Sequence, residues 1–165
     1  EKSEFSIGTL YKFFQNKEHL YKNLLLEHSE IFHEAIMRAM DESEDELGKL
    51  RHFVRAKGEL FRNDLKLIRL YLTENRGLSY NVKASLDGEL RKRYCETIDK
   101  LATIFAEGVQ NKRFKKIAEP YYLAVALDNM VNAFLFLWLE EPERHPYPED
   151  PNVILNIIFE GLITP

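Results

Sequence analysis

Histidine and carboxylate residues gather in one short stretch of the sequence, where they could in principle bind a metal ion or act in acid–base chemistry. His28 and His33 stand among Glu27, Glu30 and Glu34. The two histidines do not have the i, i+4 spacing of a helical metal site. We therefore find no metal site here, and we interpret the three glutamates as a solvated helix face. With no glycine-rich phosphate loop and no defensible Ser-His-Asp set, we expect no metal site, no cofactor and no enzymatic activity.

Three polar residues interrupt the most apolar stretch of the chain, residues 121–139. They are Asp128, Asn129 and Asn132. Polar groups are costly in lipid, so we interpret the stretch as a buried helix of a soluble protein rather than a membrane span. A buried amide needs a hydrogen-bond partner. For Asn129 and Asn132 that partner could be a ligand, a second subunit or the backbone.

Apolar residues recur with the helical period along nearly the whole chain, and no alternating strand pattern is seen. The sequence therefore predicts an all-α fold. The predicted helices cover residues 17–40, 47–61, 65–71, 86–109, 120–139 and 153–162. The residues predicted to begin them are Asn16, a Ser43–Glu46 capping box, Asn63 or Asp64, Ser85, Pro120, and Asp150 with Pro151.

Composition limits the cellular setting and the partners. The chain has 165 residues, 45% of them hydrophobic and 30% charged, which is typical of a soluble globular protein. A net charge of −4 gives no global positive field, so any DNA contact must come from a local patch. The single Cys95 excludes an internal disulfide. Because no secretory leader opens the sequence either, we expect a cytoplasmic protein.

The opening segment, residues 5–21, combines aromatic, small and basic residues in an unusual way. Ser6 is a suitable N-cap, and Gly8 would let another molecule approach the backbone closely. A short helix with a small, polar first turn has the form that enters a DNA major groove. Such helices occur in many proteins, so composition alone does not assign DNA contact.

The same segment resembles the signature of the TetR family of bacterial transcriptional regulators, which spans the end of a helix-turn-helix and the following helix. The positions that match it are Phe5, Ser6, Gly8, Thr9, Leu10, Tyr11, Phe14, Lys17 and Glu18. Residues 136–143 also resemble the usual end of the family's penultimate helix. The chain departs from the family at Glu4 and Ile7, and the resemblance implies two further helices before Glu1.

The resemblance implies two domains: the C-terminal part of a helix-turn-helix in residues 1–15, and a helical effector-binding and dimerisation domain in residues 16–165. It implies a repressor that a small hydrophobic or aromatic effector releases from double-stranded operator DNA. The alternative is a helical ligand-binding or adaptor protein with no DNA role. The residues expected to contact DNA are Ser6, Ile7, Gly8, Thr9, Tyr11, Lys12 and Lys17.

Aromatic and polar residues on the middle helices are the candidates for effector contact, with ordinary core packing as the alternative for each. They are Phe53, Phe61, Tyr71, Tyr94, Ile98, Asn129, Asn132 and Phe134. The two apolar helices near the C-terminus carry more apolar surface than one small bundle easily covers, which favours a homodimer. The expected interface residues are Leu123, Leu127, Val131, Leu135, Ile154, Ile157 and Ile158.

Overall fold

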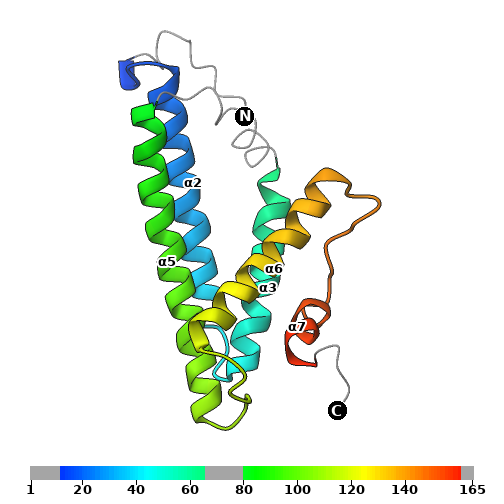
Figure 1. The fold of residues 1–165 in the computed structure, drawn as a ribbon. Helices are drawn as coiled ribbons and strands as arrows, with labels where there is room; N and C mark the ends of the chain where they lie inside the picture. Colours follow the sequence, from blue (N-terminus) through cyan, green and yellow to red (C-terminus); the bar gives the residue numbers. More distant parts are fainter. Residues whose placement is uncertain (1–11, 66–79, 161–165) are drawn as a thin grey trace.

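The computed structural model describes residues 12–65 and 80–160 of the chain. These residues are mainly helical, and no strand occurs among them. The all-α fold predicted from the sequence is therefore confirmed. The helices are α2 (Lys17–Ala39), α3 (Glu46–Asn63), α5 (Tyr80–Gln110), α6 (Pro120–Glu140) and α7 (Asn152–Phe159), as Figure 1 shows.

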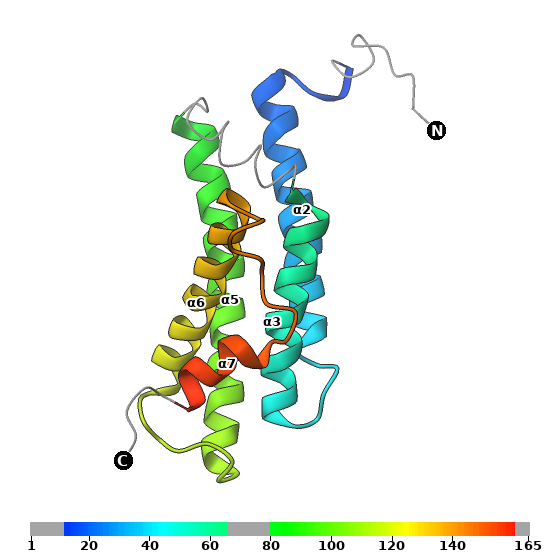
Figure 2. The ribbon, with the colours of Figure 1, turned by 90° about the vertical axis from the view of Figure 1, so that its right-hand side faces the viewer.

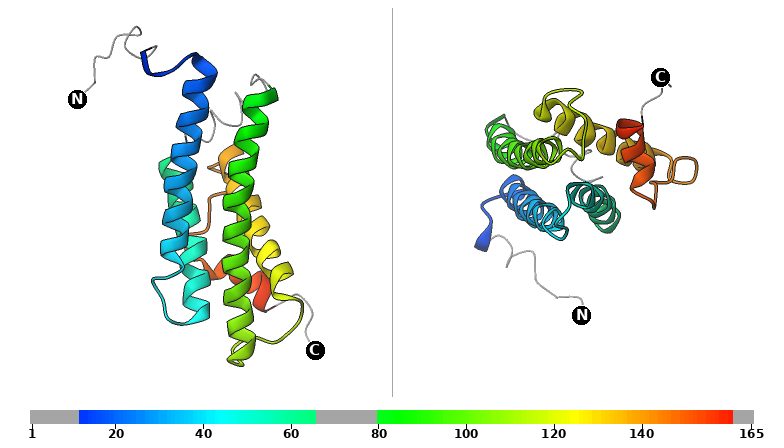
Figure 3. Two further views of the ribbon diagram at one scale, coloured as in Figure 1. Left: turned by 90° about the vertical axis from the view of Figure 1, so that its left-hand side faces the viewer. Right: turned by 90° about the horizontal axis from the view of Figure 1, so that it is seen from below.

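Two long helices form one side of the molecule. α2 and α5 lie side by side and run in the same direction, and α3 returns antiparallel to α2 (Figure 1). α6 packs on α5 and crosses α3 obliquely, so that it lies across the bundle when seen end-on (Figure 3). The short α7 packs against α3 and α6 (Figure 2). The four longer helices, α2, α3, α5 and α6, thus surround a common interior.

The N-caps of α2 and α3 test two of the predicted helix starts. Asn16 caps α2 as predicted, because its side chain accepts a hydrogen bond of 2.8 Å from the His19 backbone N–H. The predicted Ser43–Glu46 capping box is wrong. Asp45 caps α3 and accepts from the Gly48 backbone N–H at 2.9 Å, while the Ser43 hydroxyl donates to the Asp45 carboxylate.

Two further helix starts differ from the prediction. α5 begins at Tyr80, well before the predicted cap at Ser85. α7 begins at Asn152, with Pro151 in the N-cap position. Asp150 still satisfies a free backbone donor there, because its carboxylate accepts from the Asn152 backbone N–H at 2.9 Å. The start of α7 differs from the predicted Val153 by one residue, which is within the usual variation of an assigned helix end.

The hydrophobic core fills the end of the bundle where α3, α5, α6 and α7 meet. The largest side chains that are completely enclosed there come from all of these helices and from the end of α2. They are Met40, Leu50, Phe53, Val54, Ile98, Leu101, Phe105, Leu127, Leu135, Ile154 and Leu155.

α6 is long and apolar enough to cross a membrane by length and hydropathy alone. In this fold one of its faces instead packs into the core through Leu127 and Val131. Another face carries Asp128, whose carboxylate forms an ion pair with Lys57 of α3. α6 is therefore a central packing helix of the bundle.

The proline-rich segment between α6 and α7 is held against α3 by Tyr147. Its buried hydroxyl donates a hydrogen bond of 2.9 Å to the Val54 carbonyl, and burial raises the pKa of Tyr147. The ring lies so close to Gly58 that a Cβ there would come within 2.3 Å of it. The absence of a side chain at Gly58 thus lets Tyr147 fix the approach of α7 to α3.

Candidate ligand-binding site

A mainly apolar cavity of about 370 Å³ lies between α2, α3, α5 and α6. Its size and lining are those of small-molecule sites, which are concave and apolar with a few placed polar groups. Each helix contributes residues that recur every three or four positions and so share one face. The lining residues are Leu25, His28, Ser29, Phe32, His33, Ile36, Lys57, Phe61, Asp64, Leu90, Arg93, Tyr94, Thr97, Asp128, Asn132 and Phe136.

Three residues in one row along α6 line the cavity. Asp128, Asn132 and Phe136 follow each other at intervals of four positions. The Phe136 ring packs edge to face on Phe61 of α3, with 6.3 Å between ring centroids and an interplanar angle of 86°. Edge-to-face contact is a favourable geometry for aromatic pairs, so this pair closes one wall of the cavity.

Lys57, Asp128 and Asn132 form a closed hydrogen-bonded group where α3 meets α6, here called the buried polar cluster. Lys57 Nζ donates to Asp128 Oδ1 and, at 2.7 Å, to Asn132 Oδ1. Asn132 Nδ2 donates to Asp128 Oδ2 at 3.0 Å. The Lys57 and Asp128 side chains are only 11% and 3% exposed. The cluster therefore neutralises its own charges inside the bundle.

Burial has an energetic cost for this cluster. It lowers the pKa of the Lys57 ammonium, and the neighbouring Asp128 carboxylate opposes that fall. The ammonium also lies 5.3 Å from the centre of the Phe53 ring, a favourable cation–π position. A buried ion pair adds little net stability, because desolvation offsets the attraction between the charges. Charged groups that line a cavity are therefore candidates for ligand recognition.

Arg93 carries the second positive charge at the cavity, and its side chain is held by α2. The guanidinium donates to the Leu26 carbonyl at 2.9 Å and to the Ser29 hydroxyl. It also pairs with the exposed Glu30 carboxylate at 3.0 Å. These contacts join α2 to α5 and leave the Arg93 charge compensated.

His28 and His33 of α2 line the cavity, although their glutamate neighbours are exposed as predicted. His33 Nε2 lies 3.1 Å from a Glu96 carboxylate oxygen, and its Nδ1 lies 3.3 Å from the Thr97 hydroxyl. The predicted solvated face of Glu27, Glu30 and Glu34 is therefore confirmed, while His28 and His33 lie on the inner side of α2. The structure uses the imidazole of His33 to connect α2 with α5.

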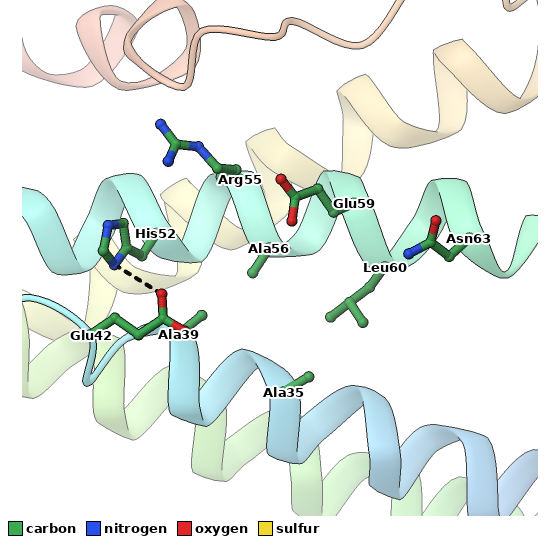
Figure 4. A pocket seen from close by; sticks show the side chains of 9 residues that line it. All are labelled: Ala35, Ala39, Glu42, His52, Arg55, Ala56, Glu59, Leu60 and Asn63. Atoms are coloured by element: carbon green, nitrogen blue, oxygen red, sulfur yellow. Dashed lines mark ion pairs between the residues drawn. The ribbon is translucent and has the colours of Figure 1, made fainter.

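A second depression of about 230 Å³ lies between α2 and α3 (Figure 4). α2 offers it only Ala35 and Ala39, while most of the α3 side chains that line it are polar. The buried His52 Nδ1 stands 3.6 Å from Glu42, beyond hydrogen-bond distance. No group of three or more potential metal ligands occurs in the described part of the chain. The larger, more apolar cavity is the better candidate site.

The structure brings three of the eight predicted effector-contact residues to this cavity. Phe61, Tyr94 and Asn132 line it. Phe53 and Ile98 are completely buried in the core instead, although Phe53 touches the buried polar cluster through Lys57.

The other three predicted contact residues lie elsewhere. Asn129 is exposed on α6, and its side chain donates to the Val125 carbonyl at 2.8 Å. Phe134 packs against the core from outside. Tyr71 lies outside the described residues. A role in binding stays a prediction for all eight.

Sequence reasoning missed Lys57, Arg93 and Asp128 as site residues. A signal was present for Lys57, because it stands midway between Phe53 and Phe61 on the apolar stripe of α3. A lysine on such a stripe is buried only with a partner. Asp128, one helical turn before Asn132, is that partner.

The residues expected to contact DNA lie mostly outside the described part of the chain. Lys12 and Lys17 are described, and both are exposed. Lys17 is the first residue of α2. DNA contact by these residues stays a prediction.

Comparison with solved structures shows strong likeness of fold at low sequence identity. No protein-family model and no curated protein matches the chain. The transcriptional regulator FadR from Bacillus subtilis, solved in complex with stearoyl-CoA, is 20% identical. Its TM-score is 0.74, and the match covers 96% of this chain and 83% of that one.

Two further regulators match over a similar extent. The TetR-family regulator PfmR from Thermus thermophilus is 22% identical with a TM-score of 0.70, over 97% of this chain and 84% of that one. The MbdR regulator from Azoarcus sp. CIB is 16% identical with a TM-score of 0.77, over 96% and 84%. The fold implied by the resemblance of the opening segment is thus confirmed: this chain has the all-α fold of TetR-family transcriptional regulators.

Proposed function

We propose that the protein is a cytoplasmic, DNA-binding transcriptional regulator whose affinity for its operator changes when a small molecule occupies the cavity. The observation that carries the proposal is the fold shared with transcriptional regulators over 96% of the chain. The helices that enclose the cavity include α2, whose first residue, Lys17, lies next to the segment that resembles a recognition helix. A ligand that favours one arrangement of these helices would change DNA affinity.

An apolar small molecule is the effector class that the cavity favours. Its walls are built largely from apolar side chains, among them Leu25, Phe32 and Phe136. The stearoyl-CoA bound by the Bacillus subtilis regulator is itself an amphipathic molecule with a long apolar chain. We therefore extend the proposal to effectors with a substantial apolar body.

The DNA-binding surface in this proposal is the opening segment, with Lys17 as a phosphate contact. Lys17→Ala in the full-length gene product should weaken binding to all sequences alike. It should also reduce the slope of log affinity against log salt by about one unit. An unchanged slope in a folded variant would remove Lys17 from the interface.

A homodimer completes the proposal, because two recognition helices read a palindromic operator together. Leu123, Leu127, Val131, Leu135 and Ile154 of the predicted interface are buried in this chain's own core. The surface that α6 and α7 offer a second copy is a neighbouring apolar stripe. Its residues are Tyr122, Ala126, Ala133, Leu137, Val153 and Ile157, which are exposed or partly exposed.

The dimer can be tested on this chain alone. Ile157 is 47% exposed, so Ile157→Glu should leave the fold intact and split the dimer. Thr103→Glu, on the exposed side of α5, is the matched control. Light scattering should show a dimer for the parent chain and control, and a monomer for Ile157→Glu. A parent chain that is monomeric at micromolar concentration would contradict the interface.

The regulator proposal is tested with DNA from the host. The full-length gene product is mixed with sheared genomic fragments, and bound fragments are recovered and sequenced. We expect enrichment of a palindromic site with half-sites about 34–36 Å apart. No enrichment at about 200 mM salt, where non-specific binding is weak, would favour the helical adaptor or ligand-binding protein instead.

A further inference from the structure

Both cations that line the cavity are paired with carboxylates among the described residues. Two cations, Lys57 and Arg93, and two carboxylates, Asp64 and Asp128, line it. Lys57 is paired with Asp128 inside the cavity, and Arg93 is paired with Glu30 at its edge. The cavity therefore holds no uncompensated cation, among the residues described, that would select an anionic ligand.

The buried polar cluster keeps hydrogen-bonding capacity beyond its internal contacts. The Lys57 ammonium has three donors, of which Asp128 and Asn132 engage two. The Asp128 carboxylate accepts one bond on each oxygen and has further lone pairs. A ligand group that accepts a hydrogen bond from Lys57 and donates one to Asp128 would use both the remaining donor and a remaining lone pair.

A charged ligand group fits this place poorly. A carboxylate bound at Lys57 would lie beside the Asp128 carboxylate, and two like charges in one poorly solvated site disfavour each other. An ammonium bound at Asp128 would meet Lys57 in the same way. Arg93 does not provide a free positive charge for an anion either, because the Glu30 carboxylate compensates it while Leu26 and Ser29 hold the guanidinium against α2.

We propose that the ligand of this cavity is an uncharged amphipathic molecule, whose hydroxyl or carboxamide group exchanges hydrogen bonds with Lys57 and Asp128. Its apolar body lies against the aromatic wall formed by Phe32, Phe61 and Phe136. The inference rests on the proposed function only in taking this cavity as the effector site. It names the chemical class that the site selects: a neutral polar head on an apolar body.

The test compares head groups on one apolar body. Decanol, decanamide, decanoate and decylammonium are titrated into the chain by calorimetry at about pH 8, where the carboxylate and ammonium head groups are both charged. The same four heads on a phenylbutyl body repeat the series with an aromatic ligand. We expect the alcohol or the amide to bind at least about tenfold tighter than either ion in one of the two series.

Two results in this series would overturn the inference. One is an anionic or cationic ligand that binds as tightly as its neutral counterparts. The other is no measurable binding by any member of either series. Neither result involves DNA, so the regulator proposal is tested separately by the recovery of genomic fragments.

A double variant tests whether the buried polar cluster produces the selectivity. Lys57→Met with Asp128→Leu removes both charges together, so that neither is left unpaired. Its preference for a neutral polar head over an ion should disappear. Lys49→Met is the matched control, because Lys49 is also on α3 but pairs with Glu107 outside the cavity at 3.4 Å.

The variant series also has outcomes that count against the inference. An unchanged preference in the double variant, folded by circular dichroism, would assign the selectivity to other residues. Asn132→Leu provides a second variant that keeps the ion pair but leaves it open on one side. We expect a partial loss of preference there, and full retention would contradict the role of the cluster.

Discussion

Two neighbouring stripes of α6 have opposite roles, although they are offset by one residue. Leu127, Val131 and Leu135 are completely or almost completely buried in the close-packed core. Asp128 and Asn132, next to them in sequence, face the cavity and carry its polar groups. The rotation of about 100° per residue separates these faces. A single apolar helix can therefore pack into the core with one face and line a cavity with the adjacent face.

α3 repeats the contrast along its length rather than around its axis. Phe53 is completely enclosed in the core. Two turns later, Phe61 is half-buried and lines the cavity. Lys57 stands between them and marks the boundary between solid packing and the open site.

The largest effect is expected where one charge of the buried polar cluster, at the boundary between core and cavity, is left unpaired. Lys57→Met alone should lower the free energy of unfolding by about 3–5 kcal/mol, because the Asp128 carboxylate then stays buried without its cation. The double variant Lys57→Met with Asp128→Leu should recover most of that loss. Chemical denaturation measures both. Equal losses in the single and double variants would show that the two charges do not act as a pair.

Truncating Phe53 and Phe61 separately compares the packed part of α3 with the part that lines the cavity. Phe53→Ala should cost about 3–5 kcal/mol of stability, since it leaves a cavity in a filled core. Phe61→Ala should cost well under half as much, because Phe61 already borders open space. Thermal unfolding of the two variants provides the comparison. A larger loss at Phe61 would place the true core at the other end of the bundle.

The contact between Gly58 and Tyr147 predicts a smaller effect. Gly58→Ala should destabilise the chain by about 1–3 kcal/mol, because the new methyl group overlaps the Tyr147 ring. Combining it with Tyr147→Ala should make the two changes less than additive. Gly88→Ala is the control, since nothing lies within 4 Å of that position. Full additivity would show that the ring does not limit this site.

The smallest predicted effect is at the start of α3, away from both core and cavity. Asp45→Ala should cost about 1 kcal/mol at neutral pH through loss of the N-cap. The hydrogen bond from the Gly48 backbone holds the pKa of Asp45 below its usual value. Its contribution is therefore present above the unfolded pKa of 3.8 and is lost as pH falls through the lower folded value.

Denaturation curves from about pH 7 down to the acid limit measure this pH dependence. The difference between the parent chain and Asp45→Ala should shrink on the acid side. Asp45→Asn is the control, because asparagine caps nearly as well but does not titrate. A pH-independent difference for Asp45→Ala would assign the loss to something other than the charged cap.

Much of the fold could be predicted because it depends on local pattern. Asn16 and Pro120 begin α2 and α6 as their residue types predict. Ser43 and Asp45 show the limit of local pattern, because both residue types are good N-caps and the sequence alone does not decide between them. In the structure the N-cap of α3 is Asp45. Ser85 shows the same limit, because α5 continues past a residue that could have begun it.

The cavity was less predictable because it is a property of four helices together. Asn132 and Asn129 are the same residue type, but the orientation of α6 against α3 partly buries Asn132 and leaves Asn129 exposed. Ile98 and Tyr94 differ in the same way on α5, one in the core and one at the cavity. Residue type thus identified polar and aromatic residues as candidates for ligand contact. Which of them lie together at the cavity depends on tertiary packing.

In the proposed function, occupancy of this cavity controls binding to DNA. The most direct measurement is the dissociation constant of the full-length protein for its recovered genomic fragment, by fluorescence anisotropy. It is made with and without saturating ligand from the head-group series, with occupancy checked by calorimetry. We expect saturating ligand to change the dissociation constant of the parent protein by at least about fivefold. An unchanged dissociation constant with the cavity fully occupied would contradict it.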